Sequence, residues 1–137
     1  MSEENKSPID CVGVVCFKGS DVLLIRRGKP PRMGEWSIPG GRIELGETER
    51  EAVLRELNEE TNVDAEILGK IEIIDAQFDG EPFRLHDYAA IWTGKNVRAG
   101  DDAAHAEFVE MSKIGQLSMW PDTVRIIQKA RQLFPAK

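Results

Sequence analysis

Residues 41–63, GRIELGETEREAVLRELNEETNV, constrain the fold of this chain more than any other segment. Two adjacent glycines, Gly40 and Gly41, introduce the segment and let the backbone approach another group closely, because glycine has no Cβ. Thr48 and Glu51 have the spacing of a capping box, in which each side chain bonds the backbone N–H of the other residue. The segment therefore predicts a tight loop that runs directly into a helix, from about residue 49 to about residue 61.

The predicted helix has an acidic side and an apolar side. Neighbouring residues of an α-helix lie about 100° apart around the axis. The acidic arc consists of Ala52, Arg55, Glu56, Glu59 and Glu60, and the adjoining apolar arc of Val53, Leu54, Leu57 and Thr61. Because an apolar arc has to face a core, we expect the carboxylates at the rim of that core rather than on the far side of the helix.

Two explanations fit the acidic arc. Glu59 and Glu60 follow Glu56 by three and four residues, so the three side chains are neighbours and repel one another. A bare Glu-x-x-Glu-Glu is most often a solvated surface, with ion pairs here to Arg50 and Arg55. The alternative is a divalent cation between the carboxylates, since Mg²⁺ and Mn²⁺ prefer carboxylate oxygens. The glycine pair, and a glutamate and an arginine at fixed distances from it, favour the cation.

These residues together resemble the Nudix box. The family pattern is Gly, five residues, Glu, seven residues, and then Arg-Glu-aliphatic-x-Glu-Glu-x-Gly-aliphatic. The matching positions are Gly41, Glu47, Arg55, Glu56, Leu57, Glu59, Glu60 and Val63. Asn62 departs from the pattern, because it stands where glycine is usual. The resemblance implies a Mg²⁺-dependent hydrolase of nucleoside diphosphates that are linked to another group.

The resemblance also implies roles for the matched residues. Glu56, Glu59 and Glu60 would bind Mg²⁺, with Mn²⁺ as a substitute, and the carbonyl of Gly40 would join them. Read by itself, the Pro-Gly-Gly sequence is an ordinary turn. Arg55 would orient Glu56 through a charge-assisted hydrogen bond. The proton acceptor for the attacking water would be Glu59, Glu47 or a downstream residue, Glu107.

Glu107 is a candidate because of the segment in which it lies. Asp101 and Asp102, followed by the apolar strand 106–109, resemble the acidic loop and strand that many family members place opposite the metal site. The alternative is that Glu107 is a solvent-facing strand residue with no role in catalysis.

Residues for substrate binding are expected just before the box. Guanidinium groups bind phosphate oxygens bidentately, and Arg26, Arg27 and Arg32 cluster there with Lys29. They can equally be solvated strand-end arginines. Trp36 either stacks on a base or packs into the loop, and the backbone around Gly41 can approach a ligand closely.

The substrate class rests on the resemblance as well. The pattern around residues 26–41 and 101–107 is similar to that of family members known as ADP-ribose pyrophosphatases, which implies ADP-ribose or a related nucleotide sugar. Nucleoside triphosphates, including oxidised ones, are the alternative within the enzyme class. The alternative of another class is a non-catalytic module that senses a nucleotide. Such modules usually lose box glutamates, and all of them are present here.

Composition limits the partners and the cellular location that we expect for the protein. The chain has 137 residues, a net charge of −6 and a pI of about 5.0, which argues against a nucleic-acid partner. It has no apolar run of membrane-spanning length. We expect a flexible tail at residues 1–9, one domain at 10–137 and a cytoplasmic location, with a homodimer left open. Cys11 and Cys16 are an odd number of strand residues apart, so they predict buried thiols on opposite faces rather than a disulfide.

The order of the expected elements indicates an α+β fold. A hairpin at 11–17 and 21–27 is followed by a loop at 28–41, the acidic helix and a long strand at 65–77 that bends at Gly69. A strand at 84–93, a polar loop at 94–104, a short strand at 106–109, a turn at 112–117 and a helix at 121–133 complete the chain. Val124, Ile127 and Leu133 are expected on the buried side of that helix. The family resemblance implies an α/β/α sandwich with a mixed, largely antiparallel sheet between the helices.

Overall fold

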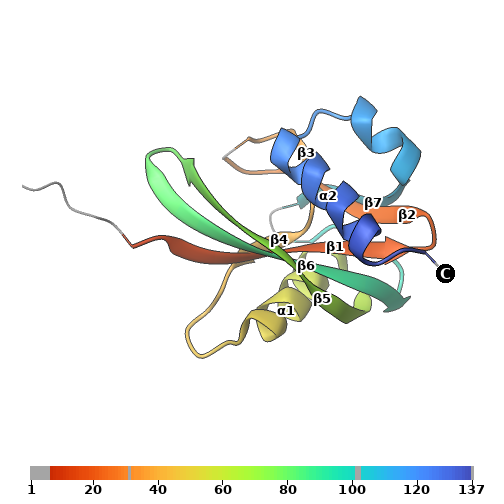
Figure 1. Ribbon diagram of the computed structural model, residues 1–137, viewed down its shortest axis with the longest axis horizontal. Coiled ribbons are helices and arrows are strands. Elements are labelled where there is room, and N and C mark those ends of the chain that lie inside the picture. Colours follow the sequence, from red (N-terminus) through yellow and green to blue (C-terminus); the bar gives the residue numbers. More distant parts are fainter. Residues whose placement is uncertain (1–6, 31, 101–102, 137) are drawn as a thin grey trace, which may run out of the picture.

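The computed structural model describes residues 7–30, 32–100 and 103–136. Their elements follow one another as strands, helix, strands and helix (Figure 1). The strands are β1 (Ile9–Lys18), β2 (Asp21–Arg27), β3 (Trp36–Ser37), β4 (Gly40–Arg42), β5 (Asp64–Phe78), β6 (Glu81–Gly94) and β7 (Ala103–Glu110). The helices are α1 (Glu49–Thr61), a 3₁₀ helix (Met111–Gln116) and α2 (Pro121–Leu133). β1 starts within the expected tail of residues 1–9, and residues 1–6 lie outside the described ranges.

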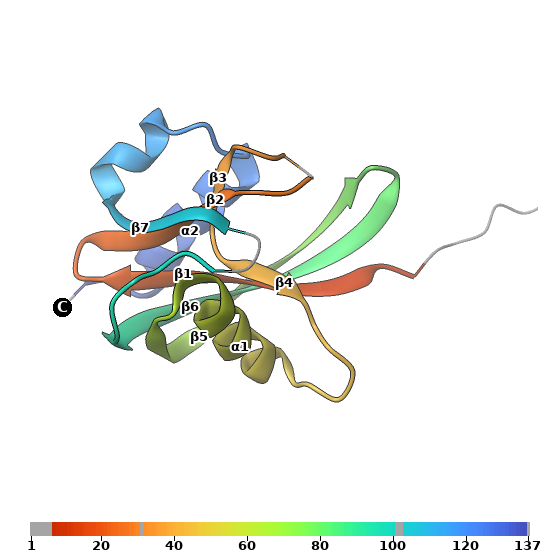
Figure 2. The same ribbon diagram turned by 180° about the vertical axis from the view of Figure 1, so that it is seen from behind.

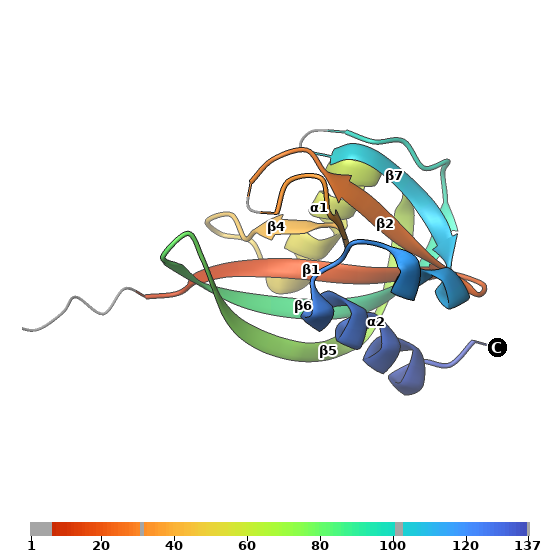
Figure 3. The same cartoon turned by 90° about the horizontal axis from the view of Figure 1, so that it is seen from above.

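The seven strands form one mixed sheet between the two α-helices. The strand order is β3-β2-β1-β6-β5, with β4 paired to β1 and β7 paired to β2. Only the β1–β6 pair is parallel among the pairings of the described strands. The two helices cover opposite faces of this sheet, as the views from behind and from above show (Figures 2 and 3). The expected α+β sandwich with a largely antiparallel sheet is confirmed.

Alternation along β1 divides the core between the two faces. Val14 and Cys16 pack beneath α1, whereas Val15 and Phe17 pack beneath α2. Cys11 and Cys16 are both buried free thiols on opposite faces of the strand, as their spacing predicts. Burial raises the pKa of the Cys16 thiol to about 12, which makes it a packing residue rather than a nucleophile.

α1 has the predicted ends and cap, but one residue of its buried side was predicted wrongly. The Thr48 side chain accepts from the Glu51 amide at 3.1 Å, and the Glu51 carboxylate accepts from the Thr48 amide at 2.9 Å. Leu54, expected in the core, is 43% exposed, whereas Glu60 is only 6% exposed. The helix is therefore rotated so that one carboxylate lies inside the core rim.

The later elements also have largely the predicted bounds. β5 is one long strand whose register shifts between Ile67 and Gly69, as expected for a bend at the glycine. α2 has the predicted ends, but Leu133 is 49% exposed rather than buried. Phe134, directly after the helix, packs against the core in that region instead. The buried side of α2 consists of Thr123, Ile126, Ile127 and Ala130, at spacings of three and four.

The expected loop at 28–41 contains the two shortest strands, and they open the sheet. β1 pairs with β2 only near the hairpin, at Phe17 and Lys18. Further along, β3 continues the pairing of β2 while β4 pairs with β1 at residues 11–13. Residues 38 and 39 therefore cross from one strand to the other, and the Pro39 carbonyl accepts from the Val14 amide at 2.9 Å. This crossing leaves a space where β1 and β2 separate.

Candidate functional site

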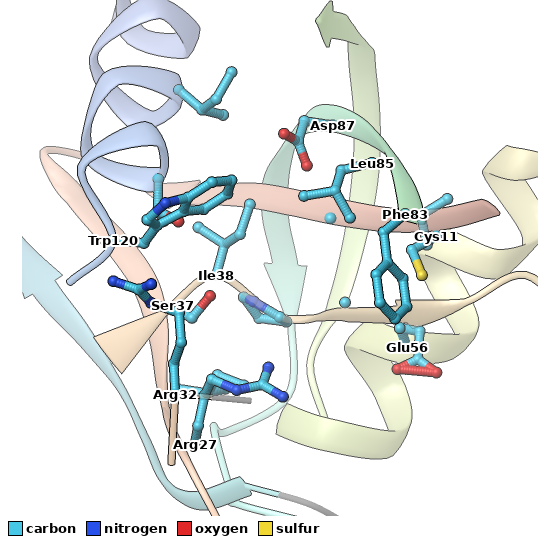
Figure 4. Close-up of a pocket in the computed structure, with 18 of the residues that line it drawn as sticks. Cys11, Arg27, Arg32, Ser37, Ile38, Glu56, Phe83, Leu85, Asp87 and Trp120 are labelled. Atoms are coloured by element: carbon cyan, nitrogen blue, oxygen red, sulfur yellow. The ribbon is translucent and has the colours of Figure 1, made fainter. Parts of the chain in front are cut away.

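A cavity of about 460 Å³ occupies the space where β1 and β2 separate. Its walls come from β1, the segment 36–42, α1, β6 and the start of α2 (Figure 4). Glu56 lies on one side of the cavity and Asp87 and Trp120 on the other. The predicted site residues that line it are Arg27, Arg32, Trp36, Gly40, Gly41, Glu56, Glu59 and Glu60. Tertiary structure thus brings most of the predicted residues together.

Arg55 organises the acidic side of this cavity. Its guanidinium donates to both carboxylate oxygens of Glu47, at 2.6 and 2.9 Å, and to the carbonyl of Arg42 at 3.0 Å. It also donates to Glu56 at 2.7 Å and to Glu59 at 3.2 Å. These hydrogen bonds raise the pKa of Arg55 and lower the pKa of Glu47. The expected bond between Arg55 and Glu56 is therefore present, and Glu47 is held as the partner of Arg55.

The glycine pair brings backbone against the glutamates. The Gly40 amide donates to Glu60 at 2.8 Å. A Cβ on Gly41 would lie 2.6 Å from a carboxylate oxygen of Glu56, so only glycine fits there without moving Glu56. Burial, and to a lesser degree the charge of Glu56, raise the pKa of Glu60 to about 8. The carboxylates of Glu56 and Glu60 are thus held close together where they are partly shielded from water, which is unfavourable unless a positive charge joins them.

The donor set of this side of the cavity fits a hard divalent cation. Glu56 lies close enough to Glu60 for its charge to raise the pKa of Glu60, and Glu59 lines the same cavity. No three acidic, histidine or cysteine side chains of the described residues converge closely enough to surround an ion, because Arg55 draws Glu56 and Glu59 to itself. The ligands offered are all oxygens, however, and Gly41 leaves the space beside them open.

The predicted phosphate-binding residues divide into two groups. Arg27 and Arg32 line the cavity, and Arg32 bonds Glu35 at 3.0 Å. Arg26 is exposed and donates to the Gly34 carbonyl at 3.1 Å, away from the lining. Trp36 is half-buried in the cavity wall, with its ring edge-on to His105 at 5.9 Å between centroids. Arg26 is therefore not brought together with the other candidates.

Glu107 also lies apart from the carboxylates of α1. It pairs with Leu24 across β2 and β7, and Leu24 packs in the core beneath α2, on the face away from α1. Its half-exposed carboxylate stands 3.1 Å from Nε2 of His105. It is absent from the cavity lining among the described residues, and the acidic loop residues Asp101 and Asp102 lie outside the described ranges.

Several lining residues were not anticipated from the sequence. Phe78, Phe83 and Trp120 give the cavity an aromatic part, and Asp87 and Asp122 lie within it. A local signal existed only for Asp87, a charged residue that stands directly before the apolar run 88–92. The aromatic residues look like ordinary core residues in the sequence, because their common location depends on β5, β6 and α2 meeting in space.

Comparisons with known proteins agree with this arrangement. The family model for the NUDIX domain matches residues 8–130. An ADP-ribose pyrophosphatase of Methanocaldococcus jannaschii is 33% identical over 115 residues, which are 81% of this chain and 67% of that protein. An 8-oxo-dGTP diphosphatase of Escherichia coli is 32% identical over 124 residues, which are 89% of this chain and 95% of that protein.

Comparison with solved structures shows that the fold, too, is that of a NUDIX domain. The NUDIX domain of Shewanella oneidensis NrtR, solved in complex with ADP ribose, superposes with a TM-score of 0.83 at 22% identity. The match covers 94% of this chain and 90% of that one. No helix of the described ranges has the length and apolar content that crossing a membrane requires. The chain belongs to the Nudix family, whose hydrolases cleave phosphorus-containing anhydrides.

Proposed function

We propose that this protein hydrolyses the pyrophosphate bond of a nucleoside diphosphate linked to another group, with ADP-ribose or a related nucleotide sugar as the first candidate. The observation that carries the proposal is a single cavity whose lining combines glutamates held against a glycine backbone with the rings of Phe78, Phe83 and Trp120. This combination suits a ligand with a charged phosphate part and a flat apolar part. The M. jannaschii relative supports ADP-ribose among such ligands.

Glu56, Glu59 and Glu60, with the carbonyl of Gly40, would hold Mg²⁺, or Mn²⁺ in its place. When bound, such an ion lowers the pKa of a coordinated water and offsets charge on the leaving phosphate. Arg55 keeps Glu56 and Glu59 oriented through its hydrogen bonds. Arg27 and Arg32, which line the same cavity, supply positive charge to the substrate phosphates.

Among the three candidates for the proton acceptor, the structure favours Glu59. Its carboxylate is 42% exposed, lines the cavity and makes one 3.2 Å bond to Arg55. Glu47 already accepts two bonds from Arg55, and Glu107 faces His105. Glu59→Gln should therefore lower kcat about a hundredfold or more. Glu107→Gln should change kcat by less than about twofold, and a larger loss of kcat in that variant would assign the role to Glu107.

The proposed function is tested with a panel of nucleotides in the presence of Mg²⁺. Glu60→Gln keeps the size of the side chain and removes its charge, so it should fold normally and lose orders of magnitude in turnover. Glu66→Gln, on the exposed side of β5, is the matched control and should keep full activity. Wild-type turnover in Glu60→Gln would contradict the assignment of the metal ligands.

The same panel separates the alternatives. The E. coli relative makes oxidised nucleoside triphosphates the second candidate, so 8-oxo-dGTP belongs in the panel beside ADP-ribose. Binding of a nucleotide without turnover of any, with Mg²⁺ and Mn²⁺ both tried, would instead indicate a nucleotide-sensing module.

A further inference from the structure

Asp87 is a buried carboxyl that accepts no hydrogen bond from any residue in the part of the chain that the structure describes. It lies on β6, exposes only 5% of its surface, and lines the cavity. No described residue donates a hydrogen bond to its side chain, and no fully buried polar side-chain atom of these residues lacks a partner, so its oxygens remain accessible from the cavity. Figure 4 shows its carboxylate beside Leu85, turned toward the cavity. An unpaired buried carboxyl costs stability, so its presence needs an explanation.

The surroundings of Asp87 are shaped around this carboxyl. Gly13 lies beside it on β1, and a Cβ on Gly13 would collide with Oδ1 of Asp87 and crowd Ile38. Glycine at position 13 therefore leaves the carboxyl the room to stand in the cavity wall.

Two cations of α2 that lie near this part of the sheet are already engaged with another acid. Arg125 of α2 donates two hydrogen bonds, at 2.9 and 2.8 Å, to Glu72, the residue across from Asp87 on β5. Lys129 donates a third bond to Glu72 at 2.7 Å. Of these two adjacent acids, Glu72 thus accepts three hydrogen bonds, while Asp87 faces the cavity. Burial, followed by the charge of Glu72, raises the pKa of Asp87 to about 7.

The part of the lining that β5, β6 and the start of α2 supply together with Asp87 is largely apolar. It includes Phe78, Phe83, Leu85 and Trp120, and Phe78 stands edge-on to Trp120 with centroids 5.6 Å apart. Aromatic walls favour a planar ring, and an acceptor in such a wall favours a ring that carries N–H groups. A lone carboxylate in an apolar wall is poorly suited to a metal ion, which needs several oxygen ligands.

We propose that Asp87 determines base specificity by accepting a hydrogen bond from the exocyclic amino group of a purine bound among these aromatic rings. The proposal rests on the proposed function, because the phosphates of the same ligand would lie at the glutamates of α1. It assigns the cavity to adenine or guanine nucleotides over purines that lack the amino group. Asp122, the other acid of the lining, is 43% exposed and pairs with Arg125 at 3.7 Å, so it suits this role less well.

The test compares ligands that differ only by the amino group. AMP is compared with purine riboside 5′-monophosphate, and GMP with IMP, by calorimetry in the Glu60→Gln background. At least one amino-bearing member should bind on the order of tenfold or more tightly than its partner. Asp87→Ala should abolish this preference. Asp87→Asn, which keeps one acceptor oxygen without the charge, should retain part of it.

Asp75→Asn is the control, since Asp75 is an exposed acid of β5 that pairs with Arg84 at 2.9 Å. Thermal melts verify that each variant is folded. A folded Asp87→Ala variant that keeps the preference would overturn the proposal, as would a parent protein with no preference or no binding. Preference without hydrolysis in the wild type would refute only the proposed function. Hydrolysis that is indifferent to Asp87 and to the amino group would refute only the role of Asp87.

Discussion

At the scale of single residues, the candidate site depends on the absence of a side chain at Gly41 and on the backbone amide of Gly40. Gly41 has no side chain where a Cβ would meet the Glu56 carboxylate, and Glu56 cannot easily retreat because Arg55 holds it at 2.7 Å. Gly40 supplies the amide that binds Glu60. The two glutamates are therefore placed by backbone as much as by their own helix.

Gly41→Ala should lower turnover about tenfold or more while changing the melting temperature little. The added Cβ would lie 2.6 Å from Glu56 and displace its carboxylate, and the backbone of Gly41 is not in the left-handed region. Steady-state kinetics with a thermal melt measure both effects. Gly115→Ala is the control, because its Cβ would enter open space. Equal turnover in Gly41→Ala and wild type would show that Glu56 is not positioned by this glycine.

The buried carboxyl of Asp87 should make stability depend on pH. Its pKa is about 7 in the fold against an ordinary value of 3.8. Because the folded pKa is raised, the contribution of this carboxyl to the free energy of unfolding is full only below about pH 4. It falls as pH rises to about 7, where the folded carboxyl ionises. Glu72 of β5 strengthens the shift, whereas His86 of β6 and Arg125 of α2 oppose it.

Asp87→Asn should therefore melt like wild type near pH 4 and higher than wild type at pH 8. The gain at pH 8 should be on the order of a few kcal/mol, since one unit of pKa corresponds to about 1.4 kcal/mol. Thermal melts across this range measure it, with Asp75→Asn as the control. A difference between variant and wild type that stays constant with pH would mean that Asp87 does not ionise in this range.

At the scale of elements, the end of α1 shows how asparagine can replace the glycine that the family usually has at this position. Asn62, which stands where the family has glycine, has a φ of 67°, in the left-handed region. Its amide bonds the Asn58 carbonyl and closes the helix, as expected for a residue at this end. The side chain also donates to the Asn96 carbonyl at 3.0 Å, a tie to the loop after β6 that the motif does not reveal.

Asn62→Val should destabilise the protein by about 1–3 kcal/mol, because a β-branched residue resists a positive φ and cannot bond Asn96. Asn62→Gly removes the bond to the Asn96 carbonyl and a long, exposed bond from Arg98 at 3.4 Å, so its cost should stay at about 1 kcal/mol, with activity kept. Paired thermal melts and assays measure both. A valine variant that melts like wild type would contradict the left-handed account of this position.

At the scale of the whole molecule, metal binding should be visible as stability. An ion that binds only the folded state stabilises it by RT ln(1 + [L]/Kd), or about 2.7 kcal/mol at a hundred times Kd. Mg²⁺ should therefore raise the melting temperature of wild type and of Glu66→Gln by several degrees. It should raise that of Glu60→Gln much less. The same increase in all three proteins would mean that the ion binds elsewhere.

The ends of α1, its capping box, the left-handed Asn62 and the bend of β5 at Gly69 could all be predicted from the sequence. Each depends on contacts within a few residues, which a local pattern records. The gathering of glutamates on one side of α1 follows from the helical period for the same reason. The match of the whole box to a known pattern extended these local predictions to the family and its sandwich fold.

Only the tertiary structure decided which acids lie inside and what they face. Glu59 and Glu60 are adjacent, yet Glu60 is buried against Gly40 because β4 crosses over that point of α1. Glu107 faces away from α1 because β7 pairs with β2 in a register that the strand itself does not encode. Asp87, which no described residue bonds, stands beside Gly13, a residue far away in the chain, because β1 and β6 are parallel neighbours. Burial and partnership are properties of segments that meet in space, so a local sequence pattern cannot determine them.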